Sequence, residues 1–165
     1  VCSSDLLHPV LAVRDVARDR ERRREPERRG AMMRVIFCGS RAWIDEGPIR
    51  EAMALLPPDA IVVHGAARGA DELAGSIARA MGLVVEAVPA DWTTHAPGWC
   101  QCHRRKWSRP APYCAGAGSR RNAAMLAMGA AAVYAFPLAD SKGTWDMVRR
   151  AKEAGVRVEV WRAGQ

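Results

Sequence analysis

The residues of this sequence that could bind an anion are concentrated in short turns where glycine stands beside a cation or a hydroxyl group. The first such turn follows an apolar run and consists of Gly39, Ser40 and Arg41. Its glycine allows a close approach of the backbone to a ligand, its serine supplies a hydroxyl group, and its arginine supplies a forked donor. These donors fit a phosphate or a carboxylate, so we expect this turn to contact an anionic ligand.

The second turn lies between another apolar run and a helix-like pattern, and it contains more of these groups. Gly65 and Gly69 have no Cβ where a ligand or a neighbouring backbone would come close, and Arg68 is a second forked donor. Asp71 falls in the first turn of the expected helix, where its carboxylate could accept a ribose hydroxyl group. A βα turn with an ordinary capping acid is the alternative interpretation. His64, at the end of the strand, is expected to be a core histidine with satisfied hydrogen bonds or a contact at the ligand's edge.

Two further turns place polar groups at expected helix starts. Lys142, Gly143 and Thr144 supply an ammonium group, a backbone without a side chain and a hydroxyl group, which together form a small anion-binding nest. The long glycine-spaced loop of a Walker motif is missing before this lysine. Arg121 and Asn122 lie near the start of the preceding helix, from which their side chains could point into the same crevice. A solvated surface charge and a second cap are the alternatives for these two residues.

These turns need a framework of strands and helices that brings them together. Apolar runs and helical periodicity predict five strands that alternate with four helices, with Ser119 as the cap of the third helix. Such alternation forces parallel pairing and right-handed crossovers. The predicted fold is therefore α/β: a Rossmann-like, mainly parallel five-stranded sheet flanked by helices, with ligands at the carboxyl ends of the strands. The strands are expected near residues 34–39, 60–63, 83–88, 130–136 and 156–161, and the helices near residues 49–56, 69–81, 119–128 and 143–154.

Length and charge indicate one domain with two basic segments. The chain has 165 residues, of which 49% are hydrophobic, and a net charge of +7. Residues 1–31 carry a net charge of +2 and are expected to be a disordered or non-native extension, with the natural start at Met32 or Met33. Residues 32–163 are expected to form a single domain, within which residues 92–121 carry +6. No apolar run has membrane-spanning length and no secretory signal is recognisable, so we expect a soluble, cytoplasmic protein.

Residues 92–117 interrupt the alternation of strands and helices and form the expected insert. This segment contains Cys100, Cys102, His103 and Cys114, which are four thiol or imidazole groups in a basic, aromatic loop. Zinc binds tetrahedral sets of this composition, and a long loop without apolar periodicity needs such a crosslink. These four residues are therefore the predicted zinc ligands, with His95 as a spare. Ordinary reduced cysteines are the alternative, because the spacing is not that of a two-residue knuckle.

Taken together, the turns resemble the SLOG superfamily, which includes the DprA and LOG proteins, and above all its YspA/YpsA-related branch. The resemblance covers residues 33 to about 161 and depends on several motifs in order at expected strand ends. It implies a Rossmann-like fold that binds a nucleotide or a nucleotide-derived ligand across those turns. The motifs are Gly39-Ser40-Arg41, His64 to Asp71, Pro89 to Trp92, Gly118 to Asn122 and Lys142 to Asp146.

One departure from the enzymatic relatives concerns catalysis. LOG-type phosphoribohydrolases, which this chain resembles at the glycine–threonine turn, carry a catalytic Glu three residues after the threonine, where this sequence has Met147. Asp146 is one residue away, and an offset of one residue on a helix turns a side chain by about 100°, so we expect it to point away from the ligand. The sequence therefore favours nucleotide binding or sensing over an enzyme.

Two alternative functions remain open from the sequence. One is a LOG-like nucleotide phosphoribohydrolase in which Asp71 or Asp146 serves as the acid. The other is a DprA-like binder of single-stranded nucleic acid, in which basic residues track the backbone and aromatic rings stack on the bases. The aromatic residues available for stacking are Trp92, Trp99, Trp107 and Tyr113.

Overall fold

A computed structural model describes residues 32–95, residue 100 and residues 113–162. The chain from Met33 onward forms one compact unit in which strands and helices alternate. The strands are β1 (Arg34–Gly39), β2 (Ile61–His64), β3 (Val84–Ala87), β4 (Ala130–Phe136) and β5 (Arg157–Val160). The helices are α2 (Gly47–Ala54), α3 (Ala70–Ala80), α4 (Ala117–Ala127) and α5 (Lys142–Glu153).

The strands form one parallel sheet in the order β3-β2-β1-β4-β5, which confirms the predicted fold class. The chain runs outward from β1 through β2 to β3 and then returns to β4 on the other side of β1. Connections therefore leave β1 and β4 in opposite directions, which opens a crevice at the carboxyl ends of these two strands. Gly39 and Phe136 end the β1–β4 ladder side by side at this point.

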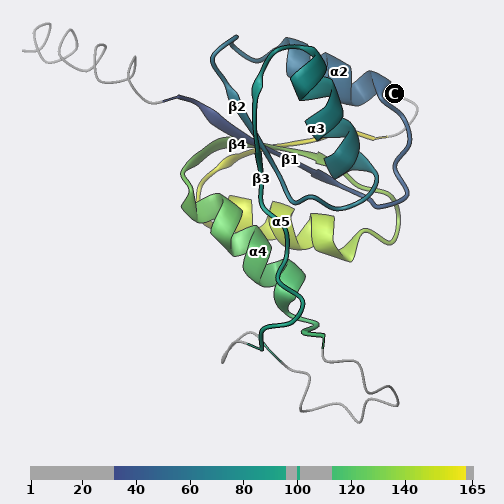
Figure 1. The fold of residues 1–165 in the computed structure, drawn as a ribbon, viewed down its shortest axis with the longest axis vertical. Coiled ribbons are helices and arrows are strands. Elements are labelled where there is room, and N and C mark those ends of the chain that lie inside the picture. The colour runs from purple at the N-terminus through teal and green to yellow at the C-terminus, as the bar shows by residue number, and fades with distance from the viewer. Residues whose placement is uncertain (1–31, 96–99, 101–112, 163–165) are drawn as a thin grey trace, which may run out of the picture. The chain divides into compact units, whose positions relative to one another are not determined.

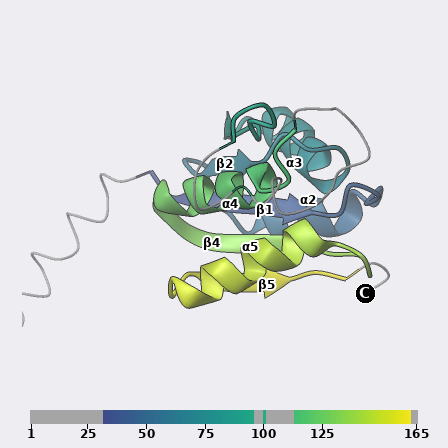
Figure 2. The ribbon, with the colours of Figure 1, turned by 90° about the horizontal axis from the view of Figure 1, so that it is seen from below.

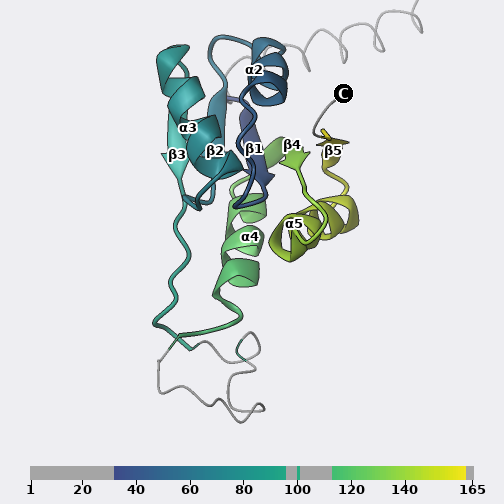
Figure 3. The ribbon, with the colours of Figure 1, turned by 90° about the vertical axis from the view of Figure 1, so that its right-hand side faces the viewer.

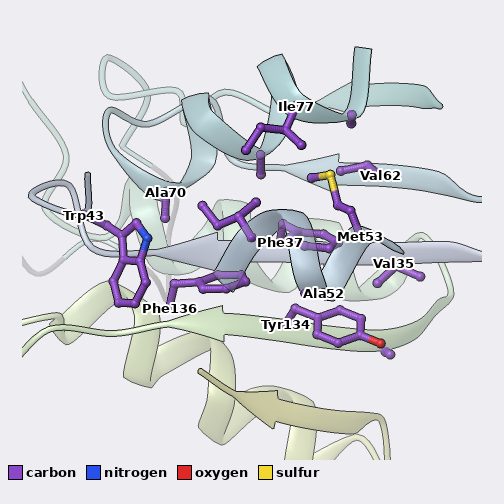
Figure 4. Close-up of a cluster of buried hydrophobic side chains, with 14 residues drawn as sticks. Val35, Phe37, Trp43, Ala52, Met53, Val62, Ala70, Ile77, Tyr134 and Phe136 are labelled. Atoms are coloured by element: carbon purple, nitrogen blue, oxygen red, sulfur yellow. The ribbon is translucent and has the colours of Figure 1, made fainter. Parts of the chain in front are cut away.

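Helices cover both faces of the sheet, with α2 and α3 on one side and α4 and α5 on the other (Figures 1 and 3). Alternate residues of β1 accordingly enter different cores: Val35 and Phe37 pack under α2 and α3, whereas Ile36 and Cys38 pack under α4 and α5. This double coverage explains why the central strands are continuous apolar runs. In the first core, the Phe37 ring lies 5.1 Å from Tyr134 and 5.9 Å from Phe136 (Figure 4).

The start of α4 differs from the prediction. The helix begins at Ala117, after Gly116, and no side chain of the described residues caps it. Ser119 was predicted as the cap, but it lies inside the first turn, and its hydroxyl group donates to Asp146 Oδ2 of α5 at 2.8 Å. The prediction was wrong because this serine has a tertiary partner that local sequence cannot show.

The two edge strands are short and carry charges. In β3, Glu86 accepts from Arg34 of β1, with 3.0 Å between Nε and Oε2. In β5, which lies at the other edge beside β4 (Figure 2), Arg157 pairs with Glu159. Among the helices in the described part of the chain, none is long and apolar enough to cross a lipid bilayer.

Candidate ligand-binding site

A cleft of about 530 Å³ lies at the carboxyl ends of β1 and β4, where the sheet topology opens a crevice. Its volume falls within the range of about 300–1,000 Å³ that is usual for small-molecule sites. The turns after β1 and β2, the loop after β4, the first turns of α3, α4 and α5, and Trp92 line it. The predicted site residues in this lining are Gly39, Ser40, Arg41, Asp71, Arg121, Asn122, Lys142, Gly143 and Thr144.

The turn after β1 is held against the end of β4. The Ser40 N–H donates to the carbonyl of Phe136 at 2.9 Å, and Ser40 Oγ accepts the N–H of Ala42 at 3.2 Å. A Cβ on Gly39 would lie 2.5 Å from the Cβ of Ala70 and 2.6 Å from the Phe136 carbonyl oxygen. Glycine is therefore needed here because the start of α3 and the end of β4 both pack against the backbone.

In the turn after β2, protein atoms fill the space beside the two glycines, whereas Ala67 lines the cleft. A Cβ on Gly65 would overlap the guanidinium group of Arg121, and a Cβ on Gly69 would overlap the carbonyl oxygen of Ser40. Gly69 also has φ +77°, a conformation that favours glycine. Arg68, which was predicted to bind phosphate, is exposed and lies outside the cleft lining. The two glycines of this turn therefore serve packing within the protein.

Asp71 joins the ends of β1 and β2. Its side chain is buried, and its two oxygens accept the N–H of Gly39 at 3.2 Å and the N–H of Gly65 at 2.9 Å. Arg121 Nη1 lies 3.8 Å from Asp71 Oδ2. Burial raises the pKa of Asp71, and the nearby guanidinium and backbone N–H groups oppose that shift. The predicted contact with a ribose hydroxyl group therefore has protein donors as competitors for both oxygens.

Arg121 and Asn122 connect α4 with the turn after β2 and with α5. Arg121 donates from Nη1 to the carbonyl of Gly65 and from Nε to Asn122 Oδ1, the latter at 3.2 Å. Asn122 Nδ2 donates to the carbonyl of Gly143 and to Asp146 Oδ2, both at 3.0 Å. Both side chains also line the cleft, so they fix its walls and present polar atoms to it.

The first turn of α5 is open towards the cleft. Ser141 Oγ accepts the N–H of Leu138 at 2.8 Å, and no side chain in the described ranges caps the helix. The first N–H groups of a helix have no intrahelical partner. Beyond the helix's own backbone and its chain neighbours, no heavy atom of the described residues lies within 4 Å of a Cβ built on Gly143. Lys142 and the buried Thr144 flank this space, which suits an anion.

The position of Asp146 corrects the expectation drawn from the sequence. Met147 is fully buried in the core under α4 and α5, and the neighbouring Asp146 lines the cleft. The one-residue offset therefore does not turn Asp146 away from this cleft. With Met147 packed inward against the sheet, residue 146 falls on the side of α5 that faces the first turn of α4.

The carboxylate of Asp146 is surrounded by donors. Besides Ser119 and Asn122, Arg150 donates from Nε at 2.9 Å, and Arg149 donates from Nη2 at 2.9 Å. Burial alone would raise the pKa of Asp146, but these hydrogen bonds together outweigh it and lower the pKa below 3.8. Asp146 is therefore an ionised group whose charge is compensated by protein.

Trp92 and Tyr113 form an aromatic wall beside the cleft. Their ring centroids lie 5.8 Å apart with the planes at 54°, and 36% of Trp92 and 44% of Tyr113 are exposed. The guanidinium group of Arg41 lies 5.8 Å from the Trp92 ring. Trp92 lines the cleft; the sequence placed it in the Pro89-to-Trp92 motif and among the residues that could stack on nucleic-acid bases. An exposed aromatic face next to a cation is a surface on which a nucleobase can stack.

His95, Cys100 and Cys114 form a cluster at the base of the insert. Their ligand atoms all lie within 4.8 Å of one another, and His95 Nδ1 is 3.0 Å from Cys100 Sγ. The structure thus brings two of the four predicted zinc ligands together and adds the spare His95. Cys102 and His103 lie outside the described residues. The three clustered groups could hold a metal ion.

His64 is buried behind the turn after β2 and does not line the cleft. Its Nδ1 accepts the N–H of Ala66 at 3.2 Å, whereas its Nε2 has no hydrogen-bond partner among the described residues. The expectation of a satisfied core histidine therefore holds for one nitrogen only. Burial lowers the pKa of His64, and the charges of Arg79 and Arg121 lower it further.

The two helix starts at the cleft favour an anion. The first turns of α4 and α5 contribute the positive ends of two helix dipoles, and Arg41 and Lys142 add two cations, against which the exposed Asp140 adds one acid. Asp71 and Asp146 are offset by arginines. Burial raises the pKa of the Cys38 thiol on the floor of the cleft, so this group stays neutral.

Comparisons with known proteins agree with this architecture. Residues 33–95 match the YspA, cpYpsA-related SLOG family. The chain is 36% identical over 131 residues to the Gene 61 protein of Mycobacterium phage D29, an alignment that covers 77% of this chain and 94% of the phage protein.

The fold is also similar to the X-ray structure of DNA processing protein A (DprA) from Streptococcus pneumoniae, with a TM-score of 0.59 and 19% sequence identity. That match covers 78% of this chain but only 50% of the DprA chain, so it shows a shared fold for half of the larger protein. Because the phage relative is matched over nearly its whole length and the first half of the fold matches the family directly, the chain belongs to the YspA, cpYpsA-related family of the SLOG superfamily.

Proposed function

We propose that this protein binds a nucleotide or a nucleotide-derived ligand in the cleft and acts as a binding or sensing protein. The observation that carries the proposal is the placement of an open, positively polarised helix start and an exposed aromatic wall around one cleft. A nucleotide has matching parts, namely an anionic phosphate and a flat base. The proposal does not depend on a metal ion in the insert.

The phosphate is assigned to the first turn of α5. Gly143 leaves room for close approach to the backbone, Lys142 supplies a cation, and no side chain of the described residues caps the helix, although the Lys142 N–H donates to the carbonyl of Asp140 at 2.8 Å. The first turn of α4, at Gly118 and Ser119, reaches the same space from the other side. Ligand contacts by Ser40, Arg41, Arg121, Asn122 and Thr144 belong to this proposal, whereas Gly65, Arg68 and Gly69 are placed outside it.

Binding without hydrolysis is the second part of the proposal. Cleavage of a glycosidic bond needs a carboxyl group that is free to protonate the leaving group or to stabilise charge on the sugar. Asp71 accepts two backbone N–H groups, and Asp146 accepts from four side chains. The third carboxylate of the cleft lining, Asp140, is exposed. A LOG-like phosphoribohydrolase is the alternative, and it would require Asp146 to exchange its partners for substrate or Asp140 to act as the acid. Steady release of free base from AMP or GMP that Asp146→Asn abolishes would favour that alternative.

Thermal unfolding and calorimetry with a small set of ligands test the proposal. The probes are AMP, ADP, ADP-ribose, adenosine and inorganic phosphate, applied to the full chain. A ligand that binds only the native state raises stability by about 2.7 kcal/mol at 100 times its Kd, so a nucleotide should shift the melting temperature clearly. Adenosine and phosphate alone should shift it less, because each fills half of the site. No shift with any of the nucleotides at millimolar concentration would contradict the proposal.

Binding of single-stranded nucleic acid is a second candidate, favoured by the exposed aromatic wall beside a cationic cleft. The titration of a labelled dT oligonucleotide at two salt concentrations distinguishes the candidates. Affinity that falls steeply with salt and is lost in Trp92→Ala would support nucleic acid. Affinity that is weaker than that for a mononucleotide, and is competed by it, would support the small ligand.

A further inference from the structure

We propose that His95, Cys100 and Cys114 form a Zn²⁺ site that joins the two ends of the insert beside the ligand cleft. This inference goes beyond nucleotide binding and is independent of it. The distances, the fixed positions of two ligands and the chemistry of the donor set carry it.

The distances are close to those that a zinc ion requires. Zn–S bonds of about 2.3 Å and Zn–N bonds of about 2.0–2.1 Å in a tetrahedron place neighbouring ligand atoms about 3.5–3.8 Å apart. In this structure the three ligand atoms lie within 4.8 Å of one another, with His95 Nδ1 and Cys100 Sγ at 3.0 Å. Shifts of about 1 Å or less would therefore give the zinc geometry.

The segment that carries His95 is fixed before any metal binds. Asp91 Oδ1 accepts three hydrogen bonds that close a tight turn. They come from the N–H of Thr93 at 3.0 Å, the hydroxyl group of Thr93 at 2.8 Å and the N–H of Thr94 at 3.1 Å. From the first turn of α4, Arg120 donates to the carbonyls of Asp91 at 2.8 Å and Thr94 at 3.1 Å. The segment that ends in His95 is therefore hydrogen-bonded to α4 through the guanidinium group of Arg120.

Cys114 is fixed by the same helix. It is fully buried, its N–H donates to the carbonyl of Trp92 at 2.7 Å, and its carbonyl accepts the N–H of Ala117 at 3.0 Å. Two ligands thus come from opposite ends of the insert that are already hydrogen-bonded to each other, and Cys100 lies between them in sequence. Such prepositioning lowers the entropic cost of assembling a metal site.

The donor set selects the ion. One imidazole and two thiolates suit zinc, whereas Mg²⁺ and Ca²⁺ require oxygen ligands. When zinc binds, the two thiols lose their protons to solvent and become thiolates, so the site adds a Zn–N bond and two Zn–S bonds. Three protein ligands leave one tetrahedral position for a water molecule or another donor.

The test uses the full chain, purified without chelator, and measures metal content by elemental analysis. We expect about one zinc per chain, and cobalt titration into the zinc-free protein should give thiolate-to-cobalt charge-transfer absorption. Loss of a group that only hydrogen-bonds to a metal ligand lowers metal affinity by about 10–100-fold. Because Cys100→Ser and His95→Ala change the ligands themselves, each should lower zinc affinity by about 100-fold or more. Cys38→Ala is the matched control, because this buried cysteine belongs to β1 and should leave zinc content and the cobalt spectrum unchanged.

Several results would overturn the proposal. The first is that wild-type protein contains no zinc and also gives no cobalt spectrum. The second is that Cys100→Ser protein retains zinc with wild-type affinity. The third is that dialysis removes zinc equally from wild type and from Cys100→Ser. Cys114→Ser is not decisive alone, since this residue is buried and its loss can disturb packing, so the partly exposed Cys100 and His95 give the decisive variants. A chelator should lower the melting temperature of wild type but not of Cys100→Ser.

Discussion

The turn after β2 (residues 64–71) and the turn before α5 (residues 140–144) have similar compositions but different surroundings. Both combine glycine, a cation and a polar residue in the first turn of a helix. In the turn after β2, Arg121 and Ser40 occupy the space beside Gly65 and Gly69. In the turn before α5, the space beside Gly143 is open to the cleft.

A glycine-rich turn can therefore serve packing as well as ligand binding. A missing Cβ allows close approach of whatever lies next to it, and only the neighbouring elements decide whether that is protein or ligand. Here α4 supplies the neighbour for the turn after β2, because Arg121 reaches back to the carbonyl of Gly65.

The largest effect is expected at the packed turn. Gly69→Ala would place a Cβ against the backbone of Ser40 and Arg41 at φ +77°, and we expect a loss of about 2–6 kcal/mol in the free energy of unfolding. Gly82→Ala is the matched control, because φ is +76° there but the described residues leave the Cβ space empty. Gly82→Ala should lower the free energy of unfolding by only about 1–3 kcal/mol, which is the cost of a non-glycine residue at positive φ. Equal losses in urea titrations would show that the turn is not packed.

The second prediction compares one cation of each turn. Lys142→Ala should weaken nucleotide binding by about 10- to 150-fold, which corresponds to about 1.5–3 kcal/mol for a hydrogen bond to a charged group. Arg68→Ala removes an exposed cation outside the cleft lining and should change the affinity by less than about twofold. Calorimetry on both folded variants measures this. The reverse order of effects would move the ligand to the turn after β2.

The third prediction uses pH at the wall of the open turn. Asp146→Asn should lower stability by about 1–2 kcal/mol at pH 7, because charge-assisted bonds from Arg150 and Ser119 are weakened. The folded pKa of Asp146 lies below the ordinary 3.8, so its contribution is present above pH 3.8 and is lost as the pH falls through the lowered value. Unfolding curves of wild type and variant should therefore converge in acid. A gap that persists unchanged at the lowest pH at which both fold would contradict this account.

The smallest effect concerns His64, which lies behind the packed turn. Its pKa is lowered from 6.5, so the unfolded chain binds a proton more readily and stability falls as the pH drops below 6.5. One such group contributes a slope of at most about 1.4 kcal/mol per pH unit. His64→Gln should flatten that part of the stability profile. An NMR titration of the imidazole that gives a pKa of 6.5 or higher would show that the turn admits solvent.

The sheet could be predicted from the sequence because its signals are local. The central strands are unbroken apolar runs that end at glycine, as at Gly39, and alternation with helices dictates parallel pairing. The cleft position followed from the same rule, since open parallel sheets bind ligands at the carboxyl ends of their strands.

Side-chain roles within the cleft depend on partners far away in sequence and could not be read from it. Ser119 looks like a cap until Asp146, 27 residues later, accepts its hydroxyl group. Arg68 looks like a phosphate ligand, but its side chain is exposed and does not line the cleft. Spacing alone likewise could not choose His95 for the cysteine cluster, because that choice depends on how the two ends of the insert are joined.

The bonds from Asp71 to the N–H groups of Gly39 and Gly65 have a consequence for the thermodynamics of binding. They fix the backbone at the ends of two neighbouring strands during folding, so the associated loss of conformational entropy does not recur when a ligand arrives. A rigid floor of this kind favours binding with little rearrangement of β1 and β2. The heat-capacity change of association should then reflect the surface that the ligand covers, without a contribution from coupled folding of these strands.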